Sequence, residues 1–344
     1  TGGAGFIGSH TCVNLLEQGY EVILLDSFVN SSEKVVKRII EICRITNNSI
    51  EKNLHVFKGD LRNKSFLIEV FQEAKESGRP IKGVIHFAGL KSVSESLENP
   101  FLYWDVNVNG TINLINVMKD YSCRRIVFSS SATIYGLTTN KLVDEKSLIK
   151  PLNPYGVTKF VVETFLNDIY KSSPKNWSIA NLRYFNPVGA HPSALIGENP
   201  LRNPTNIFPI ILDVASRKTK ILKIFGNDWP TIDGTGVRDY IHVMDIAESH
   251  LKTLEFLFNN GEKIINLNLG TGLGTSVLEL IKIFQETNNV KIPYEISSKR
   301  IGDAPLVVAN NKLAFEIIKW KPKRNLVDIC KDGWKWRLNN PNGY

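Results

Sequence analysis

Short apolar runs alternate with helical patterns along the first half of the chain, and this alternation limits the fold more than any other feature. The runs lie at residues 21–25, 54–57, 83–88, 125–128 and 177–182. Continuous apolar runs of this length are typical of parallel strands that are covered on both faces. The segments between them include 31–43, 107–119 and 155–170, which have the features of helices. The βαβα order therefore predicts an α/β fold with a doubly wound parallel sheet of the Rossmann type.

The chain opens on a glycine-rich segment with G-x-x-G-x-x-G spacing, Gly2-Gly3-Ala4-Gly5-Phe6-Ile7-Gly8. The first of the three spaced glycines permits a tight turn, the second lets the backbone approach a pyrophosphate, and the third lets helix and strand pack closely. The following helix offers free N–H groups and its positive dipole end to phosphates. A glycine turn without a ligand is the alternative for this motif alone. Because a strand normally precedes such a turn, we expect a strand upstream of Thr1.

Two acidic residues follow predicted strands. Asp26 closes the strand that comes after the glycine turn. Its carboxylate can accept hydrogen bonds from the adenosine ribose hydroxyls and would repel a 2′-phosphate, which favours NAD over NADP. Asp60 lies at another strand end, where it can bind the adenine amino group, although Asp after Gly is also common in turns.

A tyrosine and a lysine in the segment Tyr155-Gly-Val-Thr-Lys159 lie four residues apart, so a helix places both on one face. A general base at neutral pH needs a pKa near 7, about three units below that of free tyrosine. We expect Lys159, together with a positive nicotinamide ring, to lower the pKa of Tyr155 that far. Ser131 follows another strand, at the sheet edge where ligands bind in open α/β folds. Surface residues on an amphipathic helix and a capped turn are the alternatives for these two motifs taken singly.

Composition excludes several other classes of protein. The net charge is +8, but the basic residues are scattered and form no run of five, which argues against nucleic-acid binding. The four cysteines lie far apart without a C-x-x-C pair, so we expect neither a metal site nor a disulfide scaffold, and a cytoplasmic location. No apolar stretch is long enough to span a membrane, and no secretory leader is visible.

The order of these motifs resembles the extended short-chain dehydrogenase/reductase superfamily, and within it the UDP-galactose (UDP-glucose) 4-epimerase family, over essentially the whole chain. The resembling stretches are Thr1–His10, His86–Lys91, Asn107–Thr111, Ser129–Gly136, Pro154–Lys159, Leu182–Pro192, Phe225–Pro230 and Asp233–Asp245. The resemblance implies an NAD-binding Rossmann domain at residues 1–185, to which 238–260 return, and a smaller α/β domain for the UDP-sugar at 186–344.

The resemblance also implies roles for individual residues. The catalytic residues would be Tyr155, Lys159 and Ser131. The NAD-binding residues would be Gly2, Gly5, Phe6, Ile7, Gly8, Asp26, Asn30, Ser31, Asp60, Leu61, Phe87, Ala88, Lys91, Asn107, Tyr155 and Lys159. The substrate-binding residues would be Ser131, Phe185, Asn186, Asn206, Ile207, Lys223, Phe225, Arg238, Arg300, Asp303 and Val307. Lys223 departs from the family pattern, because its position is often small and apolar.

The implied reaction is epimerisation at C4 of the sugar. Tyr155 would take the proton of the 4-hydroxyl while hydride passes to NAD, and the 4-keto sugar would turn over before hydride returns. A homodimer is implied, with helices 107–119 and 155–170 at the interface. In the family, the position of Val307 adjoins the C2 substituent of the sugar, so a small side chain there predicts that N-acetylated UDP-sugars are also accepted.

Two alternatives use the same fold. A nucleotide-sugar 4,6-dehydratase or decarboxylase is the first, but the dehydratase has an Asp-Glu pair after the Ser or Thr at the strand end, where this chain has Ala132 and Thr133. A non-catalytic sensor of dinucleotides is the second. Such a sensor need not keep the Tyr155–Lys159 pair or the residues of the UDP site.

Overall fold

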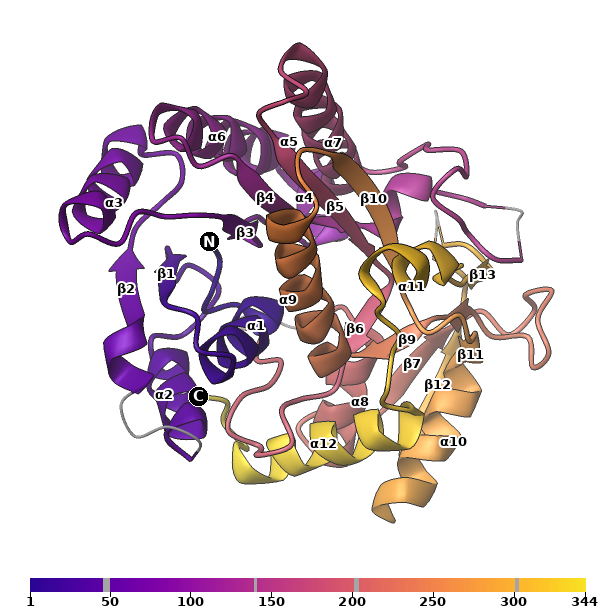
Figure 1. Cartoon of the computed structure of the whole chain (residues 1–344). Coiled ribbons are helices and arrows are strands. Elements are labelled where there is room, and N and C mark those ends of the chain that lie inside the picture. Colours follow the sequence, from indigo (N-terminus) through magenta and orange to yellow (C-terminus); the bar gives the residue numbers. More distant parts are fainter. Residues whose placement is uncertain (46–49, 139–140, 201–203, 301–302) are drawn as a thin grey trace.

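The computed structural model describes residues 1–45, 50–138, 141–200, 204–300 and 303–344. Its largest sheet has the strand order β10–β5–β4–β3, and all neighbouring strands in it are parallel. These strands are β3 (Val84–His86), β4 (Arg125–Ser131), β5 (Ser178–Tyr184) and β10 (Ile264–Leu269). A second parallel pair joins β1 (Val22–Asp26) and β2 (Leu54–Lys58). The predicted α/β class with parallel strands is therefore confirmed (Figure 1).

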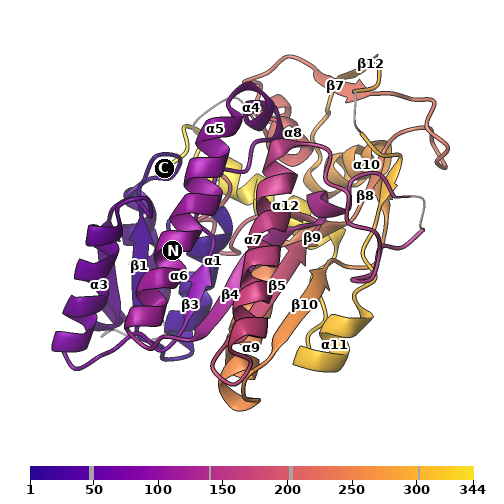
Figure 2. The same cartoon turned by 90° about the horizontal axis from the view of Figure 1, so that it is seen from above.

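Helices cover both faces of this sheet, as the doubly wound pattern requires. On one face lie α1 (Phe6–Glu17), α2 (Lys34–Arg44) and α9 (Val243–Asn259), and on the other α3 (Lys64–Glu76), α6 (Gly110–Asp120) and α7 (Pro154–Ser172) (Figures 1 and 2). Successive residues of a strand point to opposite faces. Accordingly, Val127 of β4 packs in the core with α1 and α9, whereas its neighbours Ile126 and Phe128 pack in the core with α6 and α7.

The remaining elements form a second cluster beside the sheet. Its strands are β6 (Asn186–Val188), β7 (Leu222–Phe225), β8 (Val237–Arg238), β9 (Tyr240–His242), β11 (Thr275–Ser276), β12 (Tyr294–Ser297) and β13 (Leu306–Val307). Its helices are α8 (Ile207–Ala215), α10 (Val277–Asn288) and α12 (Leu326–Asn339), which share one apolar core, while α11 (Lys312–Ile318) packs on β10 and α9. The division into two domains at residue 185 stays a prediction.

The chain returns to the large sheet after β9. Helix α9 packs against α1, β4 and β5, and β9 pairs in parallel with β6. The segment before α9 contains two short strands, β8 and β9, which lie in different sheets. Asp239 lies between them, and its carboxylate accepts hydrogen bonds from the backbone of Thr271, Gly272 and Ala309, which separates the two strands.

The helix predicted at 107–119 is longer and less regular than its sequence indicates. It follows α4 (Val93–Glu98) and runs from α5 (Pro100–Tyr103) through a π-helix (Trp104–Asn109) into α6. The wider π turn carries Asn107, whose side chain bonds both backbone groups of Leu90. Two short 3₁₀ helices, Ile50–Asn53 and Ala132–Tyr135, complete the elements.

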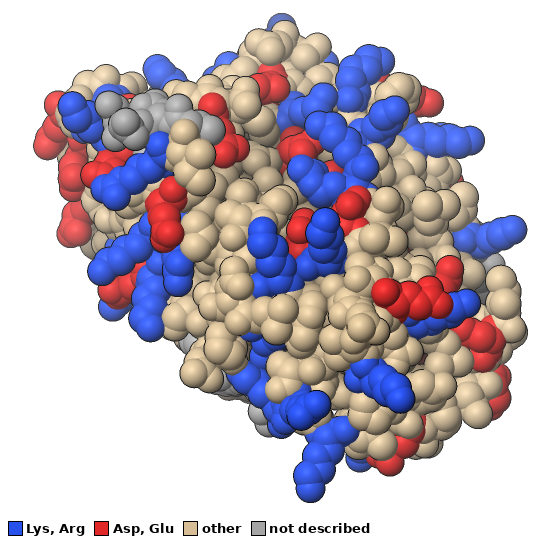
Figure 3. Space-filling view, turned by 90° about the horizontal axis from the view of Figure 1, so that it is seen from below, with Lys and Arg blue, Asp and Glu red and all other residues tan. Residues whose placement is uncertain are grey.

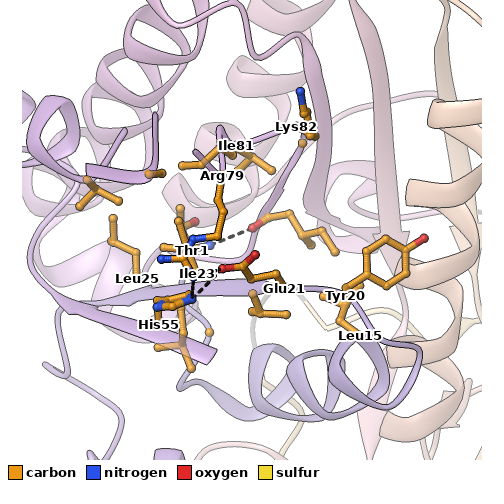
Figure 4. Close-up of a pocket in the computed structure, with 18 of the residues that line it drawn as sticks. Thr1, Leu15, Tyr20, Glu21, Ile23, Leu25, His55, Arg79, Ile81 and Lys82 are labelled. Atoms are coloured by element: carbon orange, nitrogen blue, oxygen red, sulfur yellow. Dashed lines mark hydrogen bonds and ion pairs between the residues drawn. The ribbon is translucent and has the colours of Figure 1, made fainter. Parts of the chain in front are cut away.

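A cavity of about 500 Å³ separates β1 from β3 (Figure 4). Its lining follows both strands, from Tyr20, Glu21, Ile81 and Lys82 before them to Leu25 at the end of β1 and Phe87 just after β3. Glu21 Oε1 accepts hydrogen bonds there from Arg79 Nη1 (2.6 Å) and pairs with His55 Nε2 (2.8 Å).

The backbone at the start of the chain lies between the same two strands. The Gly2 nitrogen donates to the Leu25 carbonyl (2.7 Å), and the Thr1 nitrogen donates to the Ile85 carbonyl (2.9 Å). Among the described residues, β1 pairs with β2 and β3 with β4, but β1 and β3 do not pair with each other. The strand that we expect upstream of Thr1 stays a prediction.

An ion pair fastens the segment between α11 and α12 to the start of α9. Asp245, which is fully buried, accepts hydrogen bonds from Arg324 Nη1 (2.6 Å) and from the Arg324 backbone nitrogen (3.0 Å). Removing one partner of a buried pair leaves an uncompensated charge, which is strongly destabilising. Ion pairs between exposed side chains contribute far less.

We therefore expect Arg324→Ala to lower the free energy of unfolding by about 2–3 kcal/mol, because Asp245 stays buried while Arg324 itself is partly exposed. The matched control is Lys58→Ala, which breaks an exposed pair with Glu33 at 2.7 Å and is expected to cost less than about 1 kcal/mol. Urea unfolding followed by circular dichroism measures both. Equal losses in the two variants would contradict the assignment.

Candidate active site

The carboxyl ends of the parallel strands meet at one edge of the molecule, and most of the predicted site residues lie there. Asp26 ends β1, Ser131 ends β4, and Phe185 follows the last residue of β5. Ligands bind at this edge in open α/β folds. The same edge receives the glycine turn and the start of α7, so the topology brings together residues that are up to 183 positions apart in sequence, from Gly2 to Phe185.

The glycine turn has no room for side chains. Gly2 has φ +66°, and a Cβ there would lie 2.6 Å from the Ala88 nitrogen. A Cβ on Gly8 would lie 2.2 Å from the Gly2 carbonyl oxygen. Gly5 caps α1 without a side-chain hydrogen bond, so the first turn of α1 presents backbone N–H groups at this edge. The arrangement fits a bound pyrophosphate.

Asp26 is buried beside this turn. Its carboxylate accepts hydrogen bonds from the Ala4 nitrogen, the Phe28 nitrogen and Ser31 Oγ, each at 2.9 Å. A carboxylate offers about four acceptor positions, so Asp26 keeps capacity for a ligand hydroxyl. Ser31 donates to Asp26, and Ser32 accepts from the Lys34 nitrogen at the start of α2. The contact of Ser31 with NAD stays a prediction.

The other residues predicted to contact NAD lie along the same edge, with partners of their own. Asp60 is held by Arg62, whose hydrogen bonds lower the pKa of that carboxyl group. Lys91 Nζ donates to Glu198 Oε1 at 3.1 Å. Asn30 is exposed, Leu61 is buried, Phe87 stacks at 4.6 Å on His250, Ala88 touches the glycine turn, and Phe6 and Ile7 open α1.

Tyr155 and Lys159 occupy the first turns of α7. Asn153 caps this helix by accepting a hydrogen bond from the Gly156 nitrogen (2.9 Å), and Pro154 follows at the first helical position, which favours a helix start. Ser131, at the end of β4, is among the groups that lower the pKa of Tyr155. Lys159 Nζ donates to the Ser129 carbonyl oxygen (2.7 Å) and lies 6.0 Å from the centroid of the Tyr155 ring. The three predicted catalytic residues are therefore brought together.

Burial controls the acidity of this group. Burial raises the pKa of Tyr155, while the hydrogen bond from Ser131 and the charge of Lys91 lower it. Burial also lowers the pKa of Lys159 to about 8, against the charge of Glu163, which raises it. The largest of these effects on the phenol is burial. The expectation that Lys159 and the positive nicotinamide ring together lower the pKa of Tyr155 stays a prediction.

The residues predicted to hold the sugar form an apolar wall next to Ser131. Phe185 and Val307 pack in one cluster with Ala132, the residue that follows Ser131. Val307 is also paired in register with Arg238, because β13 runs parallel to β8. Asn186 begins β6, and its backbone nitrogen donates to the Asp239 carbonyl (3.0 Å).

The residues predicted to hold UDP lie further along this second cluster of elements. The Arg300 guanidinium lies 3.7 Å from the centroid of the Phe225 ring, and Arg238 Nη1 donates to the carbonyls of Val237 and Ala304. Lys223 is exposed on β7, 3.8 Å from Glu295. Asn206 and Ile207 lie at the start of α8, and the Asp303 nitrogen donates to the Arg300 carbonyl (3.3 Å).

Sequence analysis missed polar residues around this group that form three pairs or contacts. Glu163 and Arg183 form a buried ion pair behind Lys159, Tyr184 OH lies 2.8 Å from His250 Nε2, and Glu198 binds Lys91. Helical spacing from Lys159 is a signal that could have found Glu163, since the two are four residues apart. The others depend on tertiary contacts that no local pattern reveals.

Comparisons with known proteins agree on the kind of molecule that this chain resembles. A family model described as GDP-mannose 4,6 dehydratase matches residues 1–333. A rice (Oryza sativa subsp. japonica) protein named UDP-glucose 4-epimerase 4 is 46% identical over 344 residues, which span all of this chain and 90% of the rice protein.

Two solved structures share the fold over nearly the whole chain. UDP-glucose-4-epimerase from Stenotrophomonas maltophila, with bound NAD and formylated UDP-arabinopyranose, has a TM-score of 0.93 at 44% identity and covers 99% of this chain and 97% of its own. UDP-glucose 4-epimerase from Bifidobacterium longum, in complex with NAD+ and UDP, has a TM-score of 0.92 at 40% identity and covers 100% and 98%.

Proposed function

Because the chain belongs to the UDP-glucose 4-epimerase family of extended short-chain dehydrogenases/reductases, we propose that it interconverts UDP-glucose and UDP-galactose. The observation that carries this proposal is the placement of Tyr155 and Lys159 on the first turns of α7, with Lys159 Nζ 6.0 Å from the centroid of the Tyr155 ring, and of Ser131 at the end of β4, at the carboxyl edge of the sheet. Such an arrangement suits proton transfer to and from a hydroxyl group at this edge.

The residues present at this edge fit NAD. The turn that excludes a Cβ at Gly2 and Gly8, the free first turn of α1 and the Asp26 carboxylate match its pyrophosphate and its adenosine ribose. Bound NAD supplies the reversible two-electron oxidation of the sugar at C4. Asp26 disfavours NADP, because its charge opposes a 2′-phosphate.

The residues of this chain then manage protons, charge and substrate position. The Tyr155 phenolic oxygen takes the proton of the sugar 4-hydroxyl and returns it in the second half of the reaction. Ser131, at the end of β4, orients that proton, and Lys159 contributes positive charge beside the phenol. Arg238 and Arg300 suit the diphosphate, because guanidinium groups bind phosphate oxygens in a fork geometry. UDP held in this way lets the keto sugar turn between the two transfers.

The dehydratase alternative lacks its acid and base at the corresponding place. Ala132 follows Ser131 directly and packs in an apolar cluster, and the Thr133 hydroxyl donates to Ser131 Oγ (2.8 Å). Neither side chain can remove a proton as a carboxylate does. The sensor alternative is disfavoured because the complete group of Tyr155, Lys159 and Ser131 is assembled.

The function is tested by turnover of UDP-galactose without added cofactor. We expect the purified protein to convert it, to release NAD(H) and not NADP(H) on denaturation, and to lose about 10²–10⁴-fold of its turnover on Tyr155→Phe with the cofactor still bound. Ser131→Ala should be milder or comparable. The mechanism is wrong if the Tyr155→Phe protein keeps near-full activity, and the cofactor assignment is wrong if NADP(H) is released.

Acceptance of N-acetylated UDP-sugars is the finer part of the proposal. Val307 and Phe185 share one cluster beside Ser131, and Val307 is much smaller than tyrosine. A valine at this wall leaves room for a substituent at C2 of the sugar. Local packing of Val307, or refilling of the gap by Leu306, is the alternative.

We therefore expect the parent protein also to interconvert UDP-N-acetylglucosamine and UDP-N-acetylgalactosamine. Val307→Tyr should lower kcat/KM for this pair by about 10–100-fold through steric exclusion and leave the UDP-galactose reaction largely intact. Val307→Ala is the control and should keep both activities. A parent that is inactive on the N-acetylated pair refutes the pocket argument, and a Tyr variant that keeps that activity shows that Val307 is not the gate.

A cytoplasmic homodimer completes the proposal. The four cysteines are buried free thiols, which suits a reducing compartment. No helix among the described residues has the length and apolarity of a membrane span. Large apolar side chains are exposed on α4, α5 and the π-helix, in the region where we expect the partner subunit: Val93, Leu97, Phe101 and Trp104. Both α4 and α5 pack next to α7 (Figure 2). Clustered exposed apolar groups are typical of interfaces.

We expect light scattering to give twice the chain mass of 38.7 kDa at micromolar concentration. Phe101 is 89% exposed, so Phe101→Glu should leave the fold intact and shift the protein to the monomer by placing a charge in the interface. Phe315→Glu, at another exposed phenylalanine on α11, is the control and should stay dimeric. A monomeric parent protein would refute the dimer.

A further inference from the structure

A buried carboxylate lies one helical turn beyond Lys159. Glu163 and Lys159 are four residues apart on α7, and both are about 5% exposed. Ionised groups are costly to bury unless they are paired and hydrogen-bonded. Glu163 meets this condition, because Ser130 Oγ donates to its Oε1 and Arg183 donates from Nε to Oε1 (3.0 Å) and from Nη2 to Oε2 (2.6 Å).

The Arg183 guanidinium that pairs with Glu163 is itself held by further hydrogen bonds. The same Arg183 donates from Nη1 to Tyr135 OH (2.9 Å) and to the Glu145 carbonyl (3.2 Å), so the guanidinium is fixed from two sides. Ser130 is the residue after Ser129, whose carbonyl accepts the Lys159 hydrogen bond. Strand β4 therefore holds the ammonium with one residue and the carboxylate with the next.

Glu163 is the acidic side chain among the groups that surround the Lys159 ammonium. From α7 itself the ammonium is faced by Tyr155 and Glu163, and from β4 by the Ser129 carbonyl and the Phe128 ring, whose centroid is 4.9 Å away. From β3 it is faced by His86, which burial keeps neutral by lowering its pKa. Two cations lie beyond these groups. Arg183 pairs with Glu163, and the charge of Lys91 lowers the pKa of Tyr155.

We propose that Glu163 is a positioning residue for the epimerase reaction, whose carboxylate, fixed by Ser130 and Arg183, keeps the buried Lys159 ammonium charged and in place beside Tyr155. The proposal rests on the assigned role of Lys159 in the proposed function. Glu163 acts on the reaction only through Lys159, and Arg183 opposes it as a compensating cation.

The direction of the pKa shift at Lys159 agrees with this geometry. Burial lowers the pKa of Lys159 to about 8, and the Glu163 charge raises it. A lysine is charged below its pKa, so any further lowering would discharge Lys159 near neutral pH. Removing the carboxylate should therefore make the ammonium lose its proton at lower pH, and removing the opposing Arg183 should have the reverse effect.

The experiment titrates the Lys159 side chain directly in the protein as purified. Isotope-labelled lysine and nuclear magnetic resonance report the ammonium, which is assigned by its loss in Lys159→Arg. We expect Glu163→Gln to lower the titration midpoint by about one pH unit and Arg183→Met to raise it. Ser130→Ala is the matched control, because it removes a hydrogen bond to Glu163 without changing any charge, and it should shift the midpoint by much less.

Shifts of the Lys159 midpoint in opposite directions distinguish a positioning role of Glu163 from a purely structural one. Glu163→Gln and Arg183→Met both break the buried pair, so a purely structural role predicts loss of stability in both variants and no opposed shifts of Lys159. Equal or absent shifts overturn the proposal. If either single variant fails to fold, Glu163→Gln/Arg183→Met leaves no unpaired charge, and its midpoint should lie between those of the parent and of Glu163→Gln. A midpoint equal to that of the parent, or above it, overturns the proposal.

The pH dependence of turnover supplies the link to the reaction. The basic limb of kcat/KM for UDP-galactose should move to lower pH in Glu163→Gln and to higher pH in Arg183→Met, in step with the Lys159 midpoints. The midpoints need no substrate, so they test Glu163 even if the substrate assignment fails. Opposed midpoints without matching limbs would show that Glu163 sets the charge of Lys159 but that this charge does not govern the reaction, which overturns the positioning role.

Discussion

The burial of a positive charge at the carboxyl edge of the sheet is the constraint around which the site is organised. Lys159 is nearly inaccessible, and an unpaired ammonium in such a place would give up its proton. The Ser129 carbonyl, the face of the Phe128 ring and the Glu163 carboxylate together compensate for the lost water. Two of these three groups come from β4, so the position of α7 on that strand decides whether the charge survives.

The polar network behind Lys159 extends to the wall of the substrate site. Tyr135 OH, which binds Arg183, donates to Asn268 Oδ1 (2.7 Å) on β10. The Asn268 amide donates to the Val143 carbonyl (2.9 Å), and the Val143 nitrogen donates in turn to the Val308 carbonyl (2.8 Å), next to Val307. Each link is buried, where unsatisfied groups are costly, so the chain of bonds fixes β13 relative to β4.

Local spacing predicted those parts of the site that depend on neighbours in sequence. The glycine turn, the acid at the end of β1 and the pair on α7 follow from periods of strand and helix, and the structure places them at one edge. The π-helix at Asn107 was not predictable, because it depends on bonds to Leu90. Likewise, the sequence predicts Arg183 only as the end of a strand. Its ion pair is apparent only in the structure, where Glu163 lies beside it. The surface charges did not indicate a binding site. Figure 3 shows Lys and Arg interspersed with Asp and Glu on one face.

The same physics explains why Tyr155 needs more than one cation. Burial disfavours the phenolate, and in the protein alone this effect outweighs the hydrogen bond from Ser131 and the charge of Lys91. Lys91 is itself shared, since Glu198 accepts its hydrogen bond and neutralises part of its field. The Lys159 ammonium, in turn, donates to the Ser129 carbonyl and interacts with the Glu163 carboxylate, which reduces its effect on Tyr155. The nicotinamide ring of a bound cofactor would add positive charge at the carboxyl edge, and such charge would favour the phenolate that a base near neutral pH requires.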